Sequence, residues 1–245
     1  MSEEIVEVES WVEFKHRMEK CCSRRVGEHR SLPIFRGHSD ASWFLETTLD
    51  RRIKDIDAKV NREIIAKELL GSFRRWALGF ADEATRATKP IELQCLARHY
   101  GVPTIVLDWT YSYYVASYFA FFEHHPSSSS DVSVWMLERD ADYDDTYDDA
   151  IVISDNPELL RYNPRAIEQQ AVFMIVNDPE VRIGNFPGIT LRQWIIPSCE
   201  RSVVLLDLKR MGITARSMFR NLDGAAMTAT WDVINNVENA YDYFE

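Results

Sequence analysis

An arginine and an aspartate stand beside the apolar segments of this chain, where they are available for ligand chemistry. Arg36 lies in "PIFRGHSD" between Phe35 and Gly37. A partly buried arginine needs a permanent anion, so we predict that its guanidinium group grips a phosphate or carboxylate in a fork geometry. Gly37 lets another group approach the backbone closely. The alternative is a structural salt bridge to Asp108, Asp40 or Glu46.

Asp108 follows the apolar run Val102–Leu107, which predicts a buried strand. Thr110 and Ser112 come next and lie nearer the start of the helix expected at 112–122. Either hydroxyl explains a helix cap better than Asp108 does. We therefore expect Asp108 to face the guanidinium group of Arg36 in one pocket, because ligand sites commonly form where strands end.

Two histidines are candidates for the same pocket. His99, in "ARHYG" at the end of an expected helix, has an unperturbed pKa suited to a general base. The alternative is that a cationic His99 complements the helix dipole. His38 follows the Arg-Gly pair. A His/Asp hydrolase or nuclease using His38, His99 and Asp108 stays open.

The chain resembles the FRG domain family, which is named for its (Phe/Tyr)-Arg-Gly motif. The resemblance rests on "FRGHSDASWFLETTLDRR", "LQCLARHYGVPTIVLDWTYSYYVASYFA", "RAIEQQAVFMI" and "GITARSMFRNLDGAA", in that order. Ala171 replaces the usual glycine of the third block, and Ile105 stands where the family often has arginine. The resemblance implies an FRG core over about residues 31–226 and no particular activity.

A weaker resemblance connects the chain with ADP-ribosyltransferases of the Arg-Ser-Glu type, which bind NAD. It implies that Arg36 holds the pyrophosphate and that Thr110 or Ser112 orients the nicotinamide ribose. Gln170 takes the place of the catalytic glutamate, and glutamine cannot offer negative charge to an oxocarbenium-like centre. Asp108 or Glu168 is then the candidate source of that charge.

The predicted site combines these residues in two roles. The catalytic candidates are Asp108, Gln170, Glu168 and His99. The candidates for contacts with NAD or another nucleotide are Arg36, Gly37, His38, Trp109, Thr110, Ser112 and Gln169. Trp109 is included because an indole can stack on a flat ring.

Helical and strand patterns mix without a regular βαβ alternation, which predicts an α+β fold. Periodicity indicates helices at 8–22, 61–80, 92–101, 112–122, 199–212 and 221–237, with Ser198 as an N-terminal cap and Gly101 and Gly212 at C-termini. Strands are indicated at 31–37, 102–107, 131–138, 171–177 and 192–197. We expect one domain, 1–245, with a mixed or antiparallel sheet, several packed helices and an ADP-ribosyltransferase-like arrangement as one candidate topology. The strands containing Arg36, Asp108 and Ala171 should be neighbours, bringing Arg36, Thr110 and Gln170 to one cleft.

Composition and charge limit the function classes. The 245 residues are 46% hydrophobic and carry a formal charge of −11, which disfavours general affinity for nucleic acids or anionic membranes. Four cysteines without Cys-x-x-Cys spacing indicate neither a zinc site nor a disulfide framework, so we expect no metal. The acidic N-terminus does not look like a secretory signal, and a cytoplasmic location is expected.

These features favour a nucleotide-binding protein with NAD as cofactor or substrate. Modification of a macromolecular target, or NAD cleavage by a toxin or phage-defence effector, follows by family analogy alone. Two alternatives remain. One is a non-catalytic interaction module built on a structural Arg36–Asp108 pair, and the other is the His/Asp hydrolase or nuclease.

Overall fold

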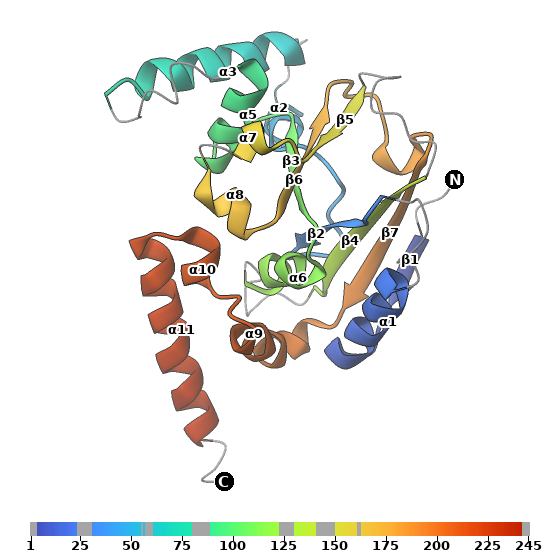
Figure 1. Ribbon diagram of the computed structural model, residues 1–245, viewed down its shortest axis with the longest axis vertical. Coiled ribbons are helices and arrows are strands. Elements are labelled where there is room, and N and C mark those ends of the chain that lie inside the picture. Colours follow the sequence, from blue (N-terminus) through green and yellow to red (C-terminus); the bar gives the residue numbers. More distant parts are fainter. Residues whose placement is uncertain are drawn as a thin grey trace.

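Strands from both ends of the chain join one mixed β-sheet. The computed structural model describes residues 4–23, 31–54, 56, 61–79, 89–122, 130–140, 150–160 and 163–241. Within these residues seven strands are ordered β1-β7-β4-β2-β3-β6-β5, and every neighbouring pair except the parallel β1–β7 is antiparallel. The strands are β1 (Glu4–Glu7), β2 (Ile34–His38), β3 (Val106–Thr110), β4 (Val132–Arg139), β5 (Ile151–Ser154), β6 (Ala171–Val176) and β7 (Ile189–Ile196). The α+β class and the mixed sheet are confirmed (Figure 1).

The neighbours β2, β3 and β6 are the three strands that the sequence predicted to lie together. The position of β3 differs from the prediction, because the strand runs from Val106 to Thr110 and not from Val102 to Leu107. Asp108 is therefore in the middle of a strand and not after its end. Val102 and Pro103 belong to the turn between the preceding helix and β3.

Helices cover one face of the sheet in two groups. Side chains of α1 (Trp11–Ser23), α6 (Tyr113–Phe122) and α9 (Arg201–Arg210) pack on β2, β4 and β7 in one buried cluster. Residues of α2 (Thr48–Ile53), α5 (Pro90–His99) and α8 (Pro164–Glu168) pack on β3 and β6 in another. Because directly paired residues share a face, the Phe35–Thr110 pair places both clusters on the same side. The boundary between them runs along β2 and β3.

The opposite face of the sheet carries its own apolar cluster. Ile34, Leu107 and Trp109 belong to it, together with residues of β4 to β7 and the short 3₁₀ helix η1 (Ile183–Asn185). Alternation along the strands explains this division, since successive side chains point to opposite faces.

Most long helices agree with the predicted ranges. The second is α3 (Arg62–Trp76), and the first, third, fourth and fifth are α1, α5, α6 and α9. The final helix is α11 (Leu222–Tyr241). Gly101 and Gly212 follow the ends of α5 and α9 with φ of 83° and 81°, as the predicted caps require. The Ser198 cap is wrong: Ser198 opens the 3₁₀ turn η2 (Ser198–Glu200), and α9 begins only after Glu200 without a side-chain cap.

The glycine after Arg36 lets α6 lie directly on β2. A Cβ atom added to Gly37 would overlap the backbone oxygen of Ala116 and would lie 2.8 Å from the backbone nitrogen of Ala120. The close approach expected at Gly37 is thus made by a helix of the protein itself. Helix α6 is thereby fixed over the boundary between the two clusters.

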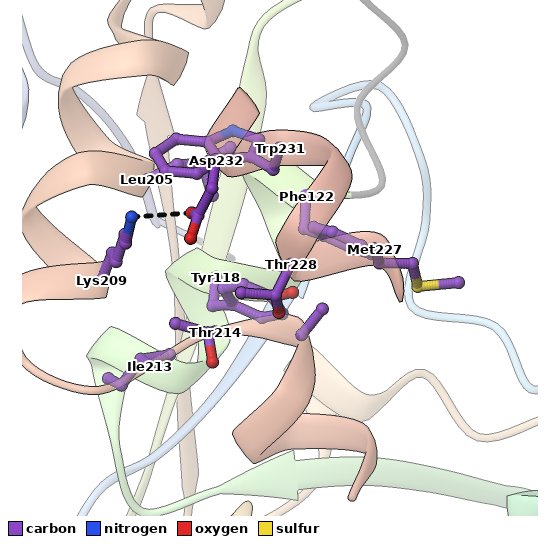
Figure 2. Close-up of a pocket in the computed structure, with 11 residues that line it drawn as sticks. Tyr118, Phe122, Leu205, Lys209, Ile213, Thr214, Met227, Thr228, Trp231 and Asp232 are labelled. Atoms are coloured by element: carbon purple, nitrogen blue, oxygen red, sulfur yellow. Dashed lines mark hydrogen bonds and ion pairs between the residues drawn. The ribbon is translucent and has the colours of Figure 1, made fainter. Parts of the chain in front are cut away.

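The C-terminal helices stand at the edge of the fold. Helix α10 (Ala215–Phe219) leads into α11, which extends along the side of the molecule (Figure 1). Gly224 of α11 packs on α10, since a Cβ there would lie 2.5 Å from the backbone oxygen of Ala215. Further along, Asp232 pairs with Lys209 of α9 at 2.7 Å (Figure 2), and the centre of the Trp231 ring lies 5.5 Å from the same ammonium nitrogen. Within the described part of the chain, no helix has the length and apolar character that crossing a membrane requires.

Candidate functional site

A cleft opens where the two helix groups meet above β2 and β3. Its volume is about 300 Å³, within the range of small-molecule sites. Its lining comes from seven elements: β2, α5, β3, α6, α8, β6 and α10 all contribute residues. A second cavity lies beneath α11, lined by Tyr118, Phe122 and Met227 among others (Figure 2). That cavity measures about 20 Å³, room for about one water, so it is a packing crevice.

Arg36 ties together the two strands at the base of the cleft. Among the described residues, pairing between β2 and β3 is confined to Phe35 and Thr110. Beyond that pair, Nη1 of Arg36 donates to the main-chain oxygen of Asp108 at 2.7 Å, and Nε lies 3.2 Å from Nε2 of His38. The guanidinium group therefore has protein partners, unlike the unsatisfied fork that the sequence predicted. The Arg36 guanidinium group contributes positive charge to the cleft from the β-sheet that forms its base.

The carboxylate of Asp108 pairs with an arginine of α5. Nε of Arg98 donates to Oδ2 of Asp108 at 2.8 Å, and Nη1 of Arg98 lies 3.3 Å from the hydroxyl of Thr48. The Asp108 side chain keeps 41% of its surface exposed, whereas that of Arg98 keeps 18%. The alternative of an Arg36–Asp108 ion pair is therefore wrong, because Arg36 binds the main-chain oxygen of Asp108 and Arg98 binds its carboxylate.

Arg165 lines the cleft from α8. Its Nε donates to the main-chain oxygen of Phe219 at 2.6 Å, and its guanidinium carbon lies 5.5 Å from the centre of the Phe219 ring. Its two terminal nitrogens make no hydrogen bond to any residue that the structure describes, and no described carboxylate pairs with it. Arg165 is therefore equipped to bind an anion that enters the cleft.

The charges around the cleft are unbalanced. Three arginines line it, Arg36, Arg98 and Arg165, against one carboxylate, that of Asp108, which leaves a formal charge of +2. The other two titratable residues of the lining, His99 and Cys95, add no charge near neutral pH. Burial and then the charge of Arg165 lower the pKa of His99, and burial and then Asp108 raise the pKa of Cys95. A cationic cleft in a chain of formal charge −11 selects for anions.

His99 reaches the cleft from the last residue of α5. Its lowered pKa favours the neutral imidazole near neutral pH. This contradicts the cationic histidine expected to complement the helix dipole, because burial and the neighbouring guanidinium group of Arg165 outweigh that effect. A neutral imidazole can accept a proton or a hydrogen bond.

His38 lies on the other side of the sheet. It is buried, and its Nδ1 lies 3.2 Å from Nε1 of Trp135. Burial, followed by the charge of Arg36, lowers the pKa of His38 to about 3. A neutral imidazole accepts at one nitrogen only, so either Trp135 or Arg36 donates to it, but not both. His38 contacts the Arg36 guanidinium group through its Nε2 atom, but it does not line the cleft.

Acid is expected to destabilise the protein through His38. The pKa of about 3 in the folded protein lies below the ordinary histidine pKa of 6.5, so between these values the unfolded chain binds a proton that the folded protein excludes. The free energy of unfolding should fall as pH drops below 6.5, by up to about 1.4 kcal/mol per pH unit from this group. Urea titrations of wild type and His38→Gln at pH 7 and pH 5 measure the difference. The variant should lose less stability than wild type, and equal losses would contradict this account.

The remaining predicted site residues divide between the cleft and its surroundings. Gly37, Trp109, Thr110 and Gln169 line the cleft. However, the hydroxyl of Thr110 donates to the main-chain oxygen of Gln169 at 2.6 Å, and the Gln169 amide donates to the oxygen of Met218 at 3.0 Å. The Trp109 ring packs in the cluster on the opposite face and is 2% exposed. It is not placed to stack on a ligand in the cleft.

Besides His38, three predicted residues lie outside the cleft lining. Ser112 Oγ accepts from the backbone nitrogen of Val115, so it caps α6, the alternative that the sequence left open. Glu168 is exposed and pairs with Arg220 at 2.7 Å. Gln170 is exposed with φ of 48°, and its main-chain oxygen accepts from Tyr111. The predicted meeting of Arg36 and Thr110 is found, but the Gln170 side chain does not join them.

Sequence reasoning overlooked Arg98, Arg165 and Phe219. The signals were present in part, because Arg98 adjoins His99 and Arg165 opens the "RAIEQQ" block. Neither residue type marks a site by itself, since a helical arginine is usually solvated and an aromatic residue usually belongs to the core. Only the three-dimensional arrangement brings α5, α8 and α10 to one cleft.

Comparisons with known proteins agree with the first resemblance. Residues 31–129 match the family model described as the FRG domain. No curated protein matched the chain, and no solved structure matched it. The match includes Arg36, Arg98 and Asp108, whereas Arg165 and Phe219 lie beyond its end. Residues 31–129 of this chain, in which β2 carries Phe-Arg-Gly and α6 packs on its glycine, are therefore similar to the FRG domain.

Proposed function

We propose that this protein binds a phosphate-bearing nucleotide in the cleft, with NAD as one candidate. The observation that carries the proposal is the +2 charge of the cleft lining in a strongly acidic chain. Phosphate groups match guanidinium donors in charge and geometry, and a partly enclosed cleft strengthens such charge-assisted hydrogen bonds. The 300 Å³ volume accommodates a ligand of this kind.

The walls of the cleft suit a ligand with an apolar or planar portion. The half-buried ring of Phe119 lines it together with the arginines, next to the buried rings of Phe35 and Phe173. Aromatic side chains offer both contact area and ring faces to a nucleobase or nicotinamide. A nucleotide combines a planar ring with phosphate groups and so fits both parts of the lining.

The proposal is one of binding and does not depend on ADP-ribosyl transfer. That reaction, as the weaker resemblance implies it, uses a polar group at Gln170, and the Gln170 side chain is exposed outside the cleft lining. Asp108 is the carboxylate that lines the cleft, and its partial exposure leaves it open to a ligand.

Hydrolysis of the bound ligand is a second candidate function. It is favoured by a neutral His99 lining the same cleft as Asp108, the combination that a general base and its electrostatic partner require. Incubation of the protein with NAD and ATP, followed by chromatography of the products, tests it. Product formation should be lost in His99→Gln. Equal product formation by the variant would exclude His99 as the base.

Thermal unfolding in the presence of nucleotides tests the proposed binding. NAD, ADP-ribose, ADP and ATP should each be titrated, with adenosine as the uncharged control. A ligand at 100 times its dissociation constant should stabilise the protein by about 2.7 kcal/mol. Stabilisation by the phosphate-bearing ligands and not by adenosine is expected. Absence of any shift with all four nucleotides would contradict the proposal.

A further inference from the structure

Arg165 is held in place by two contacts with one residue. Its Nε donates to the Phe219 oxygen at 2.6 Å, and its guanidinium group lies over the Phe219 ring at 5.5 Å. The first contact fixes the Nε edge of the guanidinium group, and the second places the group against the Phe219 ring. The two terminal nitrogens, which make no hydrogen bond to the residues described, are thus presented in one orientation.

The position of Phe219 depends in turn on the C-terminal helices. The amide of Gln169 on α8 donates to the oxygen of Met218, next to Phe219 in α10. Helix α11 supports α10 at Gly224, where an added Cβ would lie 2.5 Å from Ala215 and 3.0 Å from the Phe219 Cβ atom. The Phe219 ring also meets that of Phe119 at 6.1 Å. Helices α10 and α11 therefore determine where Arg165 points.

The positive charge of the cleft is divided between two places. Arg36 and Arg98 both bind Asp108, one at its carbonyl and the other at its carboxylate. Arg165 comes from α8 and has no carboxylate partner in the described part of the chain. Arg98 and Arg165 are held by different partners on different helices, so a ligand with two phosphates can give each arginine an anion of its own.

We propose that Arg165 recognises a second phosphate of the ligand and that Phe219 is the positioning residue for Arg165. The cleft then prefers nucleoside diphosphates, or dinucleotides joined by a diphosphate, over nucleoside monophosphates. This inference rests on the proposed nucleotide binding. It assigns the specificity to residues beyond the 31–129 match, so the C-terminal helices complete a site that the FRG segment begins.

Calorimetric titration with ADP and AMP tests the assignment, because these ligands share base and sugar and differ by one phosphate. Wild type should bind ADP roughly tenfold or more tightly than AMP, the fold-change expected of a hydrogen bond between charged groups. Arg165→Gln should remove most of this preference by weakening ADP and leaving AMP nearly unchanged. Arg75→Gln is the matched control, since it makes the same charge change at an exposed position of α3 and should keep the preference.

The role of Phe219 is tested by the same ADP/AMP ratio. Phe219→Leu keeps the main-chain oxygen but removes the ring, and it should lower the ratio, whereas Phe44→Leu at a 79% exposed site should not. The double variant Arg165→Gln, Phe219→Leu should be no less selective than Arg165→Gln alone. Gly224→Ala, which retains the ring but crowds α10, provides a second test should Phe219→Leu fail to fold.

Each outcome decides between the proposals. Equal weakening of ADP and AMP by Phe219→Leu would show that Phe219 contacts the base or sugar, overturning its positioning role. An unchanged ADP/AMP ratio in Arg165→Gln would overturn the second-phosphate assignment while nucleotide binding stands. No binding of either ligand to wild type would contradict the proposed function and this inference together.

Discussion

Replacement of Gly37 by alanine is expected to lower the free energy of unfolding by about 3 kcal/mol or more. The new methyl group would overlap the backbone oxygen of Ala116 and crowd the nitrogen of Ala120. Both are main-chain atoms of α6 and cannot turn away as a side chain would. Inserting a single carbon into a close-packed core typically costs about 1–3 kcal/mol, and the rigidity of this contact places Gly37 at the upper end. Urea denaturation followed by circular dichroism measures the change.

Gly71→Ala is the control for this substitution. Gly71 lies within α3, and a Cβ there would approach only the flexible end of Arg75, at 3.7 Å. Alanine favours helix over glycine by about 1 kcal/mol, so this variant should be slightly more stable than wild type. A Gly37→Ala protein as stable as Gly71→Ala would contradict the direct packing of α6 on β2.

Replacement of Arg98 by glutamine is expected to weaken nucleotide binding roughly 10- to 100-fold. The substitution removes one of the cationic groups and leaves the carboxylate of Asp108 without its ion pair. That carboxylate then repels an incoming phosphate. Stability should change little, because the Asp108 side chain is 41% exposed and water solvates it. Calorimetric titration of the variant with ADP measures the loss.

Asp108→Asn should have the opposite effect on affinity. It removes the negative charge that lines the cleft and raises the formal charge of the lining from +2 to +3. Binding of phosphate-bearing ligands should tighten several-fold, and more so at low salt. Weaker binding by Asp108→Asn would show that the carboxylate contacts the ligand as a hydrogen-bond acceptor.

The sequence predicted the α+β class and the neighbouring strands because those depend on local patterns. The apolar runs of β2, β4 and β6 and the periodicity of α1, α3 and α6 are strong signals. Strands β1 and β5, at the two edges of the sheet, were not predicted. Each has only four residues, which is too short for an alternating pattern of apolar and polar residues to be recognised. The bounds of β3 were misplaced because the polar Asp108 was taken to mark the end of the strand. Asp108 instead lies in the middle of β3 and lines the cleft.

The site was predicted only in part for a related reason. Arg36, Asp108 and Thr110 were correctly assigned to one cleft, although Asp108 and Thr110 were placed after the end of β3 and not within it. Which atoms they bind depends on long-range geometry: Arg36 donates to the main-chain oxygen of Asp108, and Arg98 of α5 binds its carboxylate. Arg165 and Phe219 are brought together across 54 residues of chain, which no local pattern reveals.

A crystal structure of the protein with bound ADP tests the central claim most directly, because it locates the phosphates relative to the guanidinium groups. We expect the ligand in the cleft between α5, α6 and α8, with phosphate oxygens about 3 Å from terminal nitrogens of Arg98 and Arg165. Phosphates bound at any other surface, with both arginines contacting protein alone, would contradict the account.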